Sequence, residues 1–144
     1  MKRFSFSLQK LLSLREFREK EAEIALGKAN SVRDGIQNDL DDVARKRVGA
    51  VYERKGKMPI QDLLAIEHFI TRLDMKKEKL LVDLVAAELV VEKMREKYIV
   101  ATRDKKIISK LKEKKEAVWH RENLNAEAAV LDDITNFRGR NNPI

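Results

Sequence analysis

The sequence predicts an all-α fold: a long two-helix antiparallel coiled-coil hairpin whose C-terminal helix overhangs the first. Of the 144 residues, 38% are charged and only 6% are aromatic, with five Gly and two Pro. This composition is typical of long helices and coiled coils. No Gly or Pro interrupts the stretch from Ile60 to Arg138. A helix of that length needs a partner along its side, because helical stability in proteins comes mainly from packing.

The second helix is expected over about 61–137. Within it, residues at alternating spacings of three and four form a coiled-coil seam, the stripe that faces a partner helix. Only Lys77 and Lys105 in this set are neither apolar nor Tyr. The seam comprises Ile70, Leu73, Lys77, Leu80, Leu84, Ala87, Val91, Met94, Tyr98, Ala101, Lys105 and Ile108.

The first helix is expected over about 5–54, with a weaker seam. Its small Ala residues predict close approach of the two helices in the middle of the pair. Gly27, Gly35 and Gly49 lie inside this helix, and each weakens it by about 1 kcal/mol relative to Ala, so we expect it to be the more flexible helix. The seam comprises Leu8, Leu11, Ala22, Ala25 or Leu26, Ala29, Val32, Ile36, Leu40 and Val43.

A turn is expected over about 55–60, where Gly56 and Pro59 follow one helix and open the next. So short a connection makes the helices antiparallel, and the whole of 1–144 is expected to be one coiled-coil domain. The second helix then outlasts the first. Residues beyond about Lys110 are expected to overhang and to need a binding partner.

Charge is uneven along the chain, whose net charge is +7. The stretch from Lys93 to Lys115 holds ten basic residues and three acidic ones, whereas Glu116 to Asp133 holds five acids and one Arg. The basic run is either a solvated helix face or a docking surface for acidic protein or phosphate. Nucleic acid stays an alternative, although no aromatic interleaving or familiar binding module accompanies the cations.

No catalytic, metal or cofactor site is predicted. The chain has no Cys and no Gly-rich loop of the Walker type. His68 and His120 lack ligand partners at metal spacing. Acid pairs such as Asp41–Asp42 and Asp132–Asp133 are expected on exposed helix, without the pocket that catalysis needs. We therefore expect a non-enzymatic protein that acts through protein contacts.

No apolar stretch is long enough for a signal peptide or a membrane span, so a cytoplasmic location without membrane insertion is expected. Among the large apolar residues outside the seam, Phe4 and Phe6 precede the first helix. Tyr52 and Phe69 flank the turn, and Trp119 lies in the expected overhang with little to bury it. An exposed Trp in a basic helix is a candidate binding hot spot.

The residues resemble those of the flagellar FliJ family over essentially the whole chain. No single motif carries this resemblance; the combination does. It consists of the opening Phe4–Glu16 (FSFSLQKLLSLRE), the stretch Leu111–Lys115 followed by Trp119 and Glu122, and the ending with Glu127, Leu131–Ile134 and Arg138.

The resemblance implies a component of the flagellar type III export apparatus, shaped like the stalk of a rotary ATPase. Its implied partners are the flagellar export ATPase hexamer, with the stalk in the central pore, and the cytoplasmic domain of the membrane export gate. Some members also bind export chaperones. The implied location is cytoplasmic, peripherally associated with the inner face of the cell membrane through the export apparatus.

Candidate site residues follow from the resemblance and the charge pattern. Export-gate binding is placed near the turn, on Tyr52, Phe69 and Leu73, although Leu73 also lies on the expected seam. ATPase binding is placed on the basic C-terminal segment. The candidates there are Lys105, Lys106, Lys110, Lys112, Lys114, Lys115 and Trp119.

Three other interpretations remain open at this stage. One is the equivalent stalk of a virulence-type secretion system, which shares the shape with little sequence. Another is a basic coiled-coil protein that binds nucleic acid, for which binding should depend steeply on salt. The third is a homo-oligomeric coiled-coil scaffold.

Overall fold

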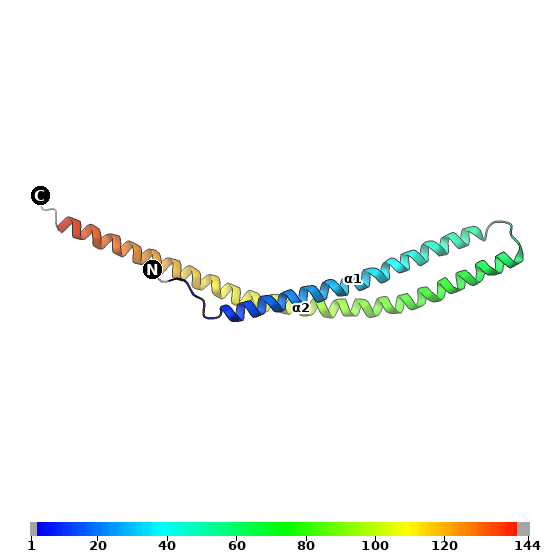
Figure 1. Cartoon of the computed structure of the whole chain (residues 1–144), viewed down its shortest axis with the longest axis horizontal. Coiled ribbons are helices and arrows are strands. Elements are labelled where there is room, and N and C mark those ends of the chain that lie inside the picture. Colours follow the sequence, from blue (N-terminus) through cyan, green and yellow to red (C-terminus); the bar gives the residue numbers. More distant parts are fainter. Residues whose placement is uncertain (1–2, 141–144) are drawn as a thin grey trace. The chain divides into compact units, whose positions relative to one another are not determined.

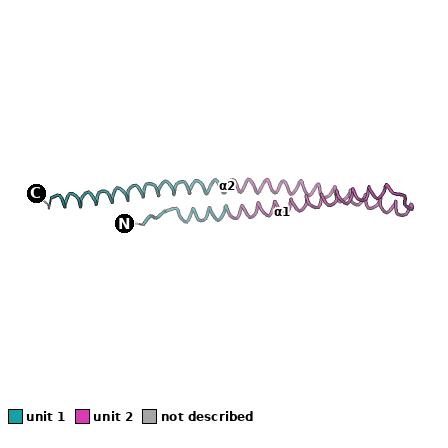
Figure 2. Tube along the Cα trace, turned by 90° about the horizontal axis from the view of Figure 1, so that it is seen from above, with its two compact units in different colours: residues 1–19, 101–144 teal, residues 20–100 magenta. Residues whose placement is uncertain are grey.

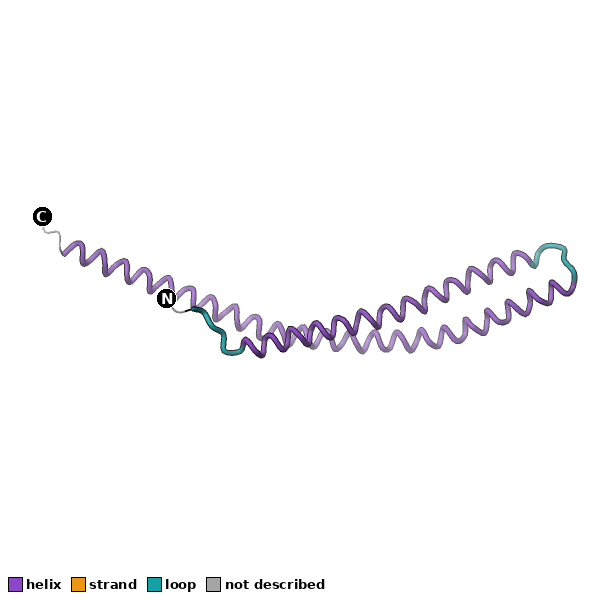
Figure 3. The backbone as a smooth tube through the Cα atoms, in the orientation of Figure 1, coloured by secondary structure: helices purple, strands orange, loops and turns teal. Residues whose placement is uncertain are grey.

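The structure, a computed structural model, describes residues 3–140. It contains two helices, α1 (Gln9–Glu53) and α2 (Ile60–Arg140), and no strand in the described range (Figures 1 and 3). The predicted all-α hairpin is confirmed. Contacts divide the chain into two units, which Figure 2 colours separately. Unit 1 is Met1–Glu19 with Ala101–Ile144, and unit 2 is Lys20–Val100.

Ion pairs in unit 2 establish that the helices run antiparallel. Arg47 bonds Asp74 at 2.8 Å, and Arg54 bonds Glu67 at 2.6 Å. The residue numbers therefore rise along α1 while they fall along α2. Arg54 is the first residue after α1, so its pair with Glu67 joins the two chain segments beside the turn at residues 54–59. The turn and the helix ends that flank it, residues 52–69, are called here the tip.

The first helix begins later than the expected residue 5. Phe6 is buried, and its carbonyl accepts a bond from the Gln9 amide at 3.1 Å in a turn that precedes α1. Helical geometry from residue 5 would point this side chain elsewhere, because successive helical residues rotate by about 100°. Burial of Phe6 therefore fixes the N-terminal segment (residues 3–8) in a non-helical path.

The turn is formed by the residues predicted from the sequence, Gly56 and Pro59. The Gly56 amide bonds the Glu53 carbonyl at 3.2 Å, which ends α1 in a tight turn. The Pro59 carbonyl then accepts the amides of Asp62 and Leu63 at 3.1 Å, so Pro59 opens α2. At its other end α2 runs to Arg140, past the expected end near 137, because one Gly at 139 weakens a helix without ending it.

The seam of α2 lies where the spacing predicts. Every predicted position except the exposed Lys77 is buried or half-buried. In unit 2 the most enclosed are Ile70, Leu73, Ala87 and Val91. The α1 residues buried in the same unit are Ala29, Val43 and Ala50.

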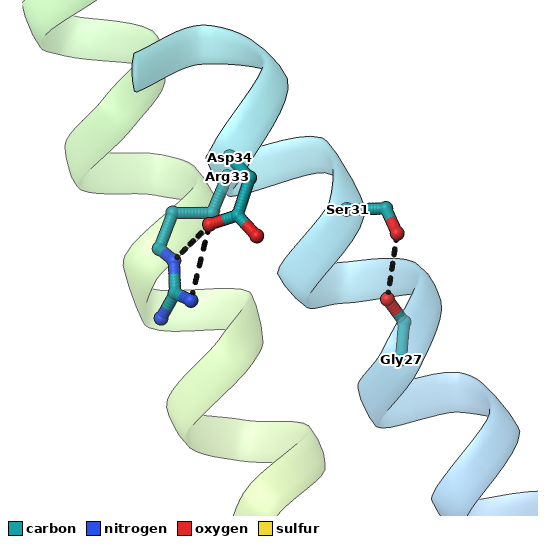
Figure 4. Close-up of polar contacts among 4 residues, drawn as sticks. All are labelled: Gly27, Ser31, Arg33 and Asp34. Atoms are coloured by element: carbon teal, nitrogen blue, oxygen red, sulfur yellow. Dashed lines mark hydrogen bonds and ion pairs between the residues drawn. The ribbon is translucent and has the colours of Figure 1, made fainter. Parts of the chain in front are cut away.

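The seam of α1 differs from the prediction at Val32. That side chain is 59% exposed, and Arg33 occupies the seam position instead. Both residues fit the spacing between Ala29 and Ile36. Arg33 can lie there because its aliphatic stem covers apolar surface while its guanidinium reaches outward. The guanidinium bonds the Asp34 carboxylate at 3.2 Å, as Figure 4 shows.

The glycines of α1 leave the helix continuous. Gly27, Gly35 and Gly49 all have helical backbone, and a Cβ at any of them would meet nothing within 4 Å. The Gly27 carbonyl also accepts a bond from the Ser31 hydroxyl at 3.0 Å (Figure 4). No packing constraint requires glycine at these positions, so their cost to helix stability is not offset by a close contact.

Candidate protein-binding surfaces

The N-terminal segment packs along α2 within unit 1. Phe6, Leu12 and Ile108 form a buried cluster, against which four further apolar side chains pack: Phe4, Leu8, Leu11 and Leu111. The ring of Phe4 lies 5.9 Å from that of Trp119, tilted by 56°. Residues of α2 as far as Trp119 therefore have a partner within the chain.

The expected overhang beyond about Lys110, with an exposed Trp119, is therefore wrong: α2 is covered as far as Trp119, and the overhang is shorter than predicted. Trp119 is half-buried and contacts the rings of both Phe4 and His120; the His120 centroid is 4.9 Å away in an edge-to-face arrangement. The reason is the non-helical path of the N-terminal segment, in which residues 3–6 precede the turn at residues 7–8. About 3.3 Å per residue of extended chain covers more of α2 than the same residues would as helix, at about 1.5 Å.

A pocket of about 440 Å³ lies beside the Phe4–Trp119 contact. Three cations surround it, and its apolar walls come from Phe4, Val118 and Trp119. One acid, Glu122, and the hydroxyl residue Ser5 complete the lining. The cations are Arg3, Lys114 and Lys115. An aromatic wall with cations at its rim suits an acidic peptide that also carries an apolar side chain.

The six candidate lysines differ in availability. Lys106, Lys110, Lys114 and Lys115 are exposed, and Lys112 is half-buried. Lys105 is different, because its ammonium donates to the Glu19 carboxylate at 3.1 Å. The structure thus brings Lys114, Lys115 and Trp119 together at one pocket and places Lys105 in the seam.

Beyond Trp119 and its neighbours, α2 continues as an uncovered helix. Within residues 124–140, called here the free end, every residue except the half-buried Glu127 is exposed. Five large apolar side chains are among them, each 47–65% exposed: Leu124, Val130, Leu131, Ile134 and Phe137. Such a stripe on a single helix indicates a surface for a partner.

The tip candidates do not share one face. Tyr52 is 77% exposed and stands two residues after buried Ala50, so it points away from the seam. Phe69, 37% exposed, precedes buried Ile70 and lines a shallow hollow of about 340 Å³ that Tyr52 does not line. The Arg72 guanidinium lies 6.0 Å from the Phe69 ring centroid.

Leu73 is buried in the seam, with 6% of its surface exposed. A partner cannot reach it unless the helices separate. The structure therefore places Leu73 with the packing residues, as its seam position predicts, and leaves Tyr52 and Phe69 as the accessible aromatic side chains of the tip.

A second groove, of about 520 Å³, lies in the middle of unit 2. Four small residues line it, namely Ala25, Ala29, Ala86 and Ala87. Larger apolar side chains stand around them, from Val32, Ile36, Val90 and Met94, with Lys28 and Asp83 at the rim. The small Ala residues of the predicted α1 seam therefore lie beside larger apolar side chains that remain accessible in this groove.

Sequence reasoning missed the polar positions of the α1 seam, although the predicted α2 seam included Lys77 and Lys105. Arg15 and Glu19 fill the gap between Leu12 and Ala22 at spacings of three and four. The Arg15 guanidinium donates to the Asp104 carbonyl at 2.8 Å, and Glu19 holds Lys105. The spacing alone could have found them, had polar residues been admitted to the pattern.

Two titrations reflect exposed ion pairs. The Lys46 ammonium hydrogen-bonds Asp42 at 3.1 Å and lowers the pKa of that carboxyl. The hydrogen bond to Asp74 likewise raises the pKa of Arg47. Both effects belong to surface pairs and mark no reactive group.

Residues 3–140 contain no grouping of His, Cys, Asp or Glu that could hold a metal ion. Neither helix has, in the same described range, a stretch with the length and hydropathy needed to cross a lipid bilayer. The surfaces that remain are the basic pocket, the free end, the tip and the groove of unit 2.

Comparison with known proteins agrees with this description. Curated protein sequences gave no match. A solved structure, described as that of a YscO homologue from Chlamydia trachomatis, matches with a TM-score of 0.59 at 15% identity. The match covers 96% of this chain and 94% of that one, and shows that the two share a fold. The family described as "Flagellar FliJ protein" matches residues 4–143, so the chain belongs to the flagellar FliJ family.

Proposed function

We propose that this protein is a non-enzymatic stalk of the flagellar type III export apparatus, which binds the export ATPase ring and links it to the membrane export gate. Membership of the FliJ family supports the assignment to flagellar export. The ATPase contact is proposed for unit 1 and the gate contact for the tip. Peripheral association with the inner face of the membrane would follow from the gate contact.

The observation that carries the ATPase contact is the free end of α2. Its apolar stripe has no cover within residues 3–140, and a single helix with exposed apolar side chains gains stability when a partner buries them. The basic pocket at Trp119 lies in the same unit. Apolar and basic surfaces together suit a partner surface that carries acidic and apolar side chains.

The proposed effect on the ATPase is a shift in population. If the free end binds ring subunits better in one nucleotide state than in another, it favours that state and promotes ring assembly or turnover. This requires contacts that differ between states, and no chemistry by the stalk itself. Escort of export chaperones is proposed as a further role for the exposed apolar surface.

The test is ATPase rate and ring formation with and without the protein. We expect stimulation by the parent chain and a loss of at least about tenfold in affinity for the variant Leu131→Glu/Ile134→Glu, since each buried apolar side chain contributes roughly 1.5–3 kcal/mol. The matched control is Val48→Glu, at a 70% exposed position of unit 2. The ATPase contact would be refuted if the parent chain neither bound the ATPase nor stimulated it.

The gate contact is tested separately with the soluble cytoplasmic domain of the export gate. Tyr52→Ala and Phe69→Ala, both in unit 2, should weaken binding. Phe17→Ala, at an exposed aromatic residue of unit 1, should not. Equal binding by all three variants would exclude the tip as the gate-binding surface. Leu73→Ala should instead lower Tm, because it leaves a cavity in the seam.

A further inference from the structure

Four apolar residues of α2 in unit 2 form a patch that neither the ATPase nor the gate contact uses. Val82, Val85, Ala86 and Leu89 are all exposed, Val82 by 69% and Leu89 by 68%. They follow one another at helical spacings of three, one and three residues and so share one face, called here the outer patch. The seam residues Leu84, Ala87 and Val91 lie on the opposite face, and Ala86 stands at the edge of the outer patch, where it also lines the groove of unit 2.

The surrounding stretch is apolar on both sides. From Leu80 to Val91 the only charged residues are Asp83 and Glu88. A helix that is apolar all round is usually covered on both faces. Within unit 2, α1 covers one of these faces. The outer patch therefore indicates a second helix as its cover.

Charged residues border the outer patch in a repeating order. Glu78 and Lys79 stand one turn before it, Glu92 and Lys93 one turn after it, and all four are exposed. Glu92 bonds Arg95 of its own helix at 3.1 Å, with both side chains at least half exposed. The other three form no ion pair among residues 3–140.

The sevenfold repeat sorts these residues into two edges. Glu78, Val85 and Glu92 follow one edge of the face, because they are seven residues apart. Lys79, Ala86 and Lys93 follow the other edge. Val82 and Leu89 run along the middle. One edge is thus acid–apolar–acid and the other is base–apolar–base.

This pattern is complementary to itself in one orientation only. When two such helices lie parallel, each edge of one faces the opposite edge of the other, so Glu78 meets Lys79 of the second copy and Glu92 meets its Lys93. Val85 then meets Ala86. In an antiparallel pair, like edges would face each other, and acids would oppose acids. Charge therefore favours a parallel, in-register pair.

We propose that the outer patch binds the outer patch of a second copy of this chain, in a parallel, two-fold symmetric dimer. The proposal rests on unit 2 alone and goes beyond the proposed export function. The patch spans only about two helical turns, far less than a standard stable interface. Association is therefore weak and depends on concentration.

The first test uses charge reversal and sedimentation equilibrium. The all-basic variant Glu78→Lys/Glu92→Lys and the all-acidic variant Lys79→Glu/Lys93→Glu should each dimerise about tenfold or more weakly than the parent. When mixed, they should associate at least as well as the parent, since every edge then meets its opposite. Circular dichroism checks that both variants remain helical.

Two results would overturn the dimer. One is a parent chain that stays monomeric up to about millimolar concentration, where a dimer with a Kd of about 1 mM would be well populated. The other is association of the parent with no selective pairing of the two variants, which would show that another surface holds the copies together.

Orientation has its own test, because the chain contains no native cysteine. In the parallel pair Val82 faces Val82 of the second copy, so Val82→Cys should form an intermolecular disulfide under mild oxidation. Val48→Cys, at a position of similar exposure (70%), is the matched control. Its cross-linking rate should be at least about tenfold lower, because a disulfide forms readily only when the dimer holds the two cysteines at the required separation. Equal rates would contradict a parallel, in-register pair.

Discussion

The Lys105 ammonium and the Glu19 carboxylate join the two helices of unit 1 at 3.1 Å, with side chains 31% and 18% exposed. The inter-helix pairs of unit 2, Arg47–Asp74 and Arg54–Glu67, are more exposed, at 41–48%. Lys105 also stands at a seam position. Its charge is thus committed within the chain, which distinguishes it from the other basic residues proposed for ATPase binding.

A double-mutant cycle measures this pair. Glu19→Ala and Lys105→Ala should each lower the free energy of unfolding, with a coupling energy of about 1 kcal/mol, because partial burial reduces solvent screening of the bond. Urea unfolding gives the values. The control pair is Lys20–Glu23, at 3.9 Å and with both side chains more than half exposed, where coupling should be near zero. Equal coupling in the two pairs would contradict a structural role for Lys105.

Gly35→Ala should raise the free energy of unfolding by about 0.5–1 kcal/mol, because Ala loses less backbone entropy in a helix than Gly. The new Cβ meets nothing within 4 Å, so no packing penalty opposes the gain. Thermal or urea unfolding measures it. Gly56→Ala, in the tip with its Cβ 3.5 Å from the Glu53 carbonyl, is the control and should bring no such gain. A destabilised Gly35→Ala would show that α1 has an unseen contact there.

The Asp42 carboxyl should titrate below the ordinary aspartate pKa, chiefly because Lys46 hydrogen-bonds it. A lowered folded-state pKa means that the pair's stabilisation is complete above the ordinary aspartate pKa and is lost as pH falls through the lowered value. NMR titration of the carboxyl measures the pKa directly. Lys46→Ala should raise it towards the ordinary value. Arg45→Ala should raise it less, since Arg45 acts only through a weaker charge interaction.

Trp119 is the only tryptophan of the chain, so its fluorescence reports the surroundings of this one indole, of which the Phe4 ring is a part. Phe4→Ala should shift its emission to longer wavelength, because water then reaches the indole. It should also lower stability by about 0.5–1.5 kcal/mol beyond the loss of buried area. Phe17→Ala, at a 59% exposed aromatic residue, should leave the spectrum unchanged. An unchanged spectrum in Phe4→Ala would mean that the N-terminal segment does not cover Trp119.

The regular part of the fold could be predicted from the sequence because the signal repeats. Spacings of three and four from Ile70 to Ile108 identify the α2 seam, and Gly56 with Pro59 identifies the tip. The spacing did not identify the α1 seam uniquely. Between Ala29 and Ile36 the spacing admits both Val32 and Arg33, and hydrophobicity favours the residue that the structure leaves exposed.

The candidate sites could be predicted only where they depend on local pattern. The pairing of Phe4 with Trp119 joins residues far apart in sequence, one of them outside any helix, so no periodicity marks it. The exposure of Leu124, Leu131 and Ile134 depends on how far the N-terminal segment reaches along α2. That reach is set by the burial of Phe6, a tertiary contact.

The contact between Phe4 and Trp119 also bears on the order in which the chain folds. Unit 2 can close from the tip outward, because each new pair of residues lies only a little further apart in sequence than the last. Unit 1 must instead join residues 3–19 to residues beyond 101. Closing so long a loop carries an entropy cost unless the hairpin has already shortened it. Unit 1 should therefore form last during synthesis and open first on unfolding, so that the surface proposed to bind the ATPase is completed only after most of α2 has been made.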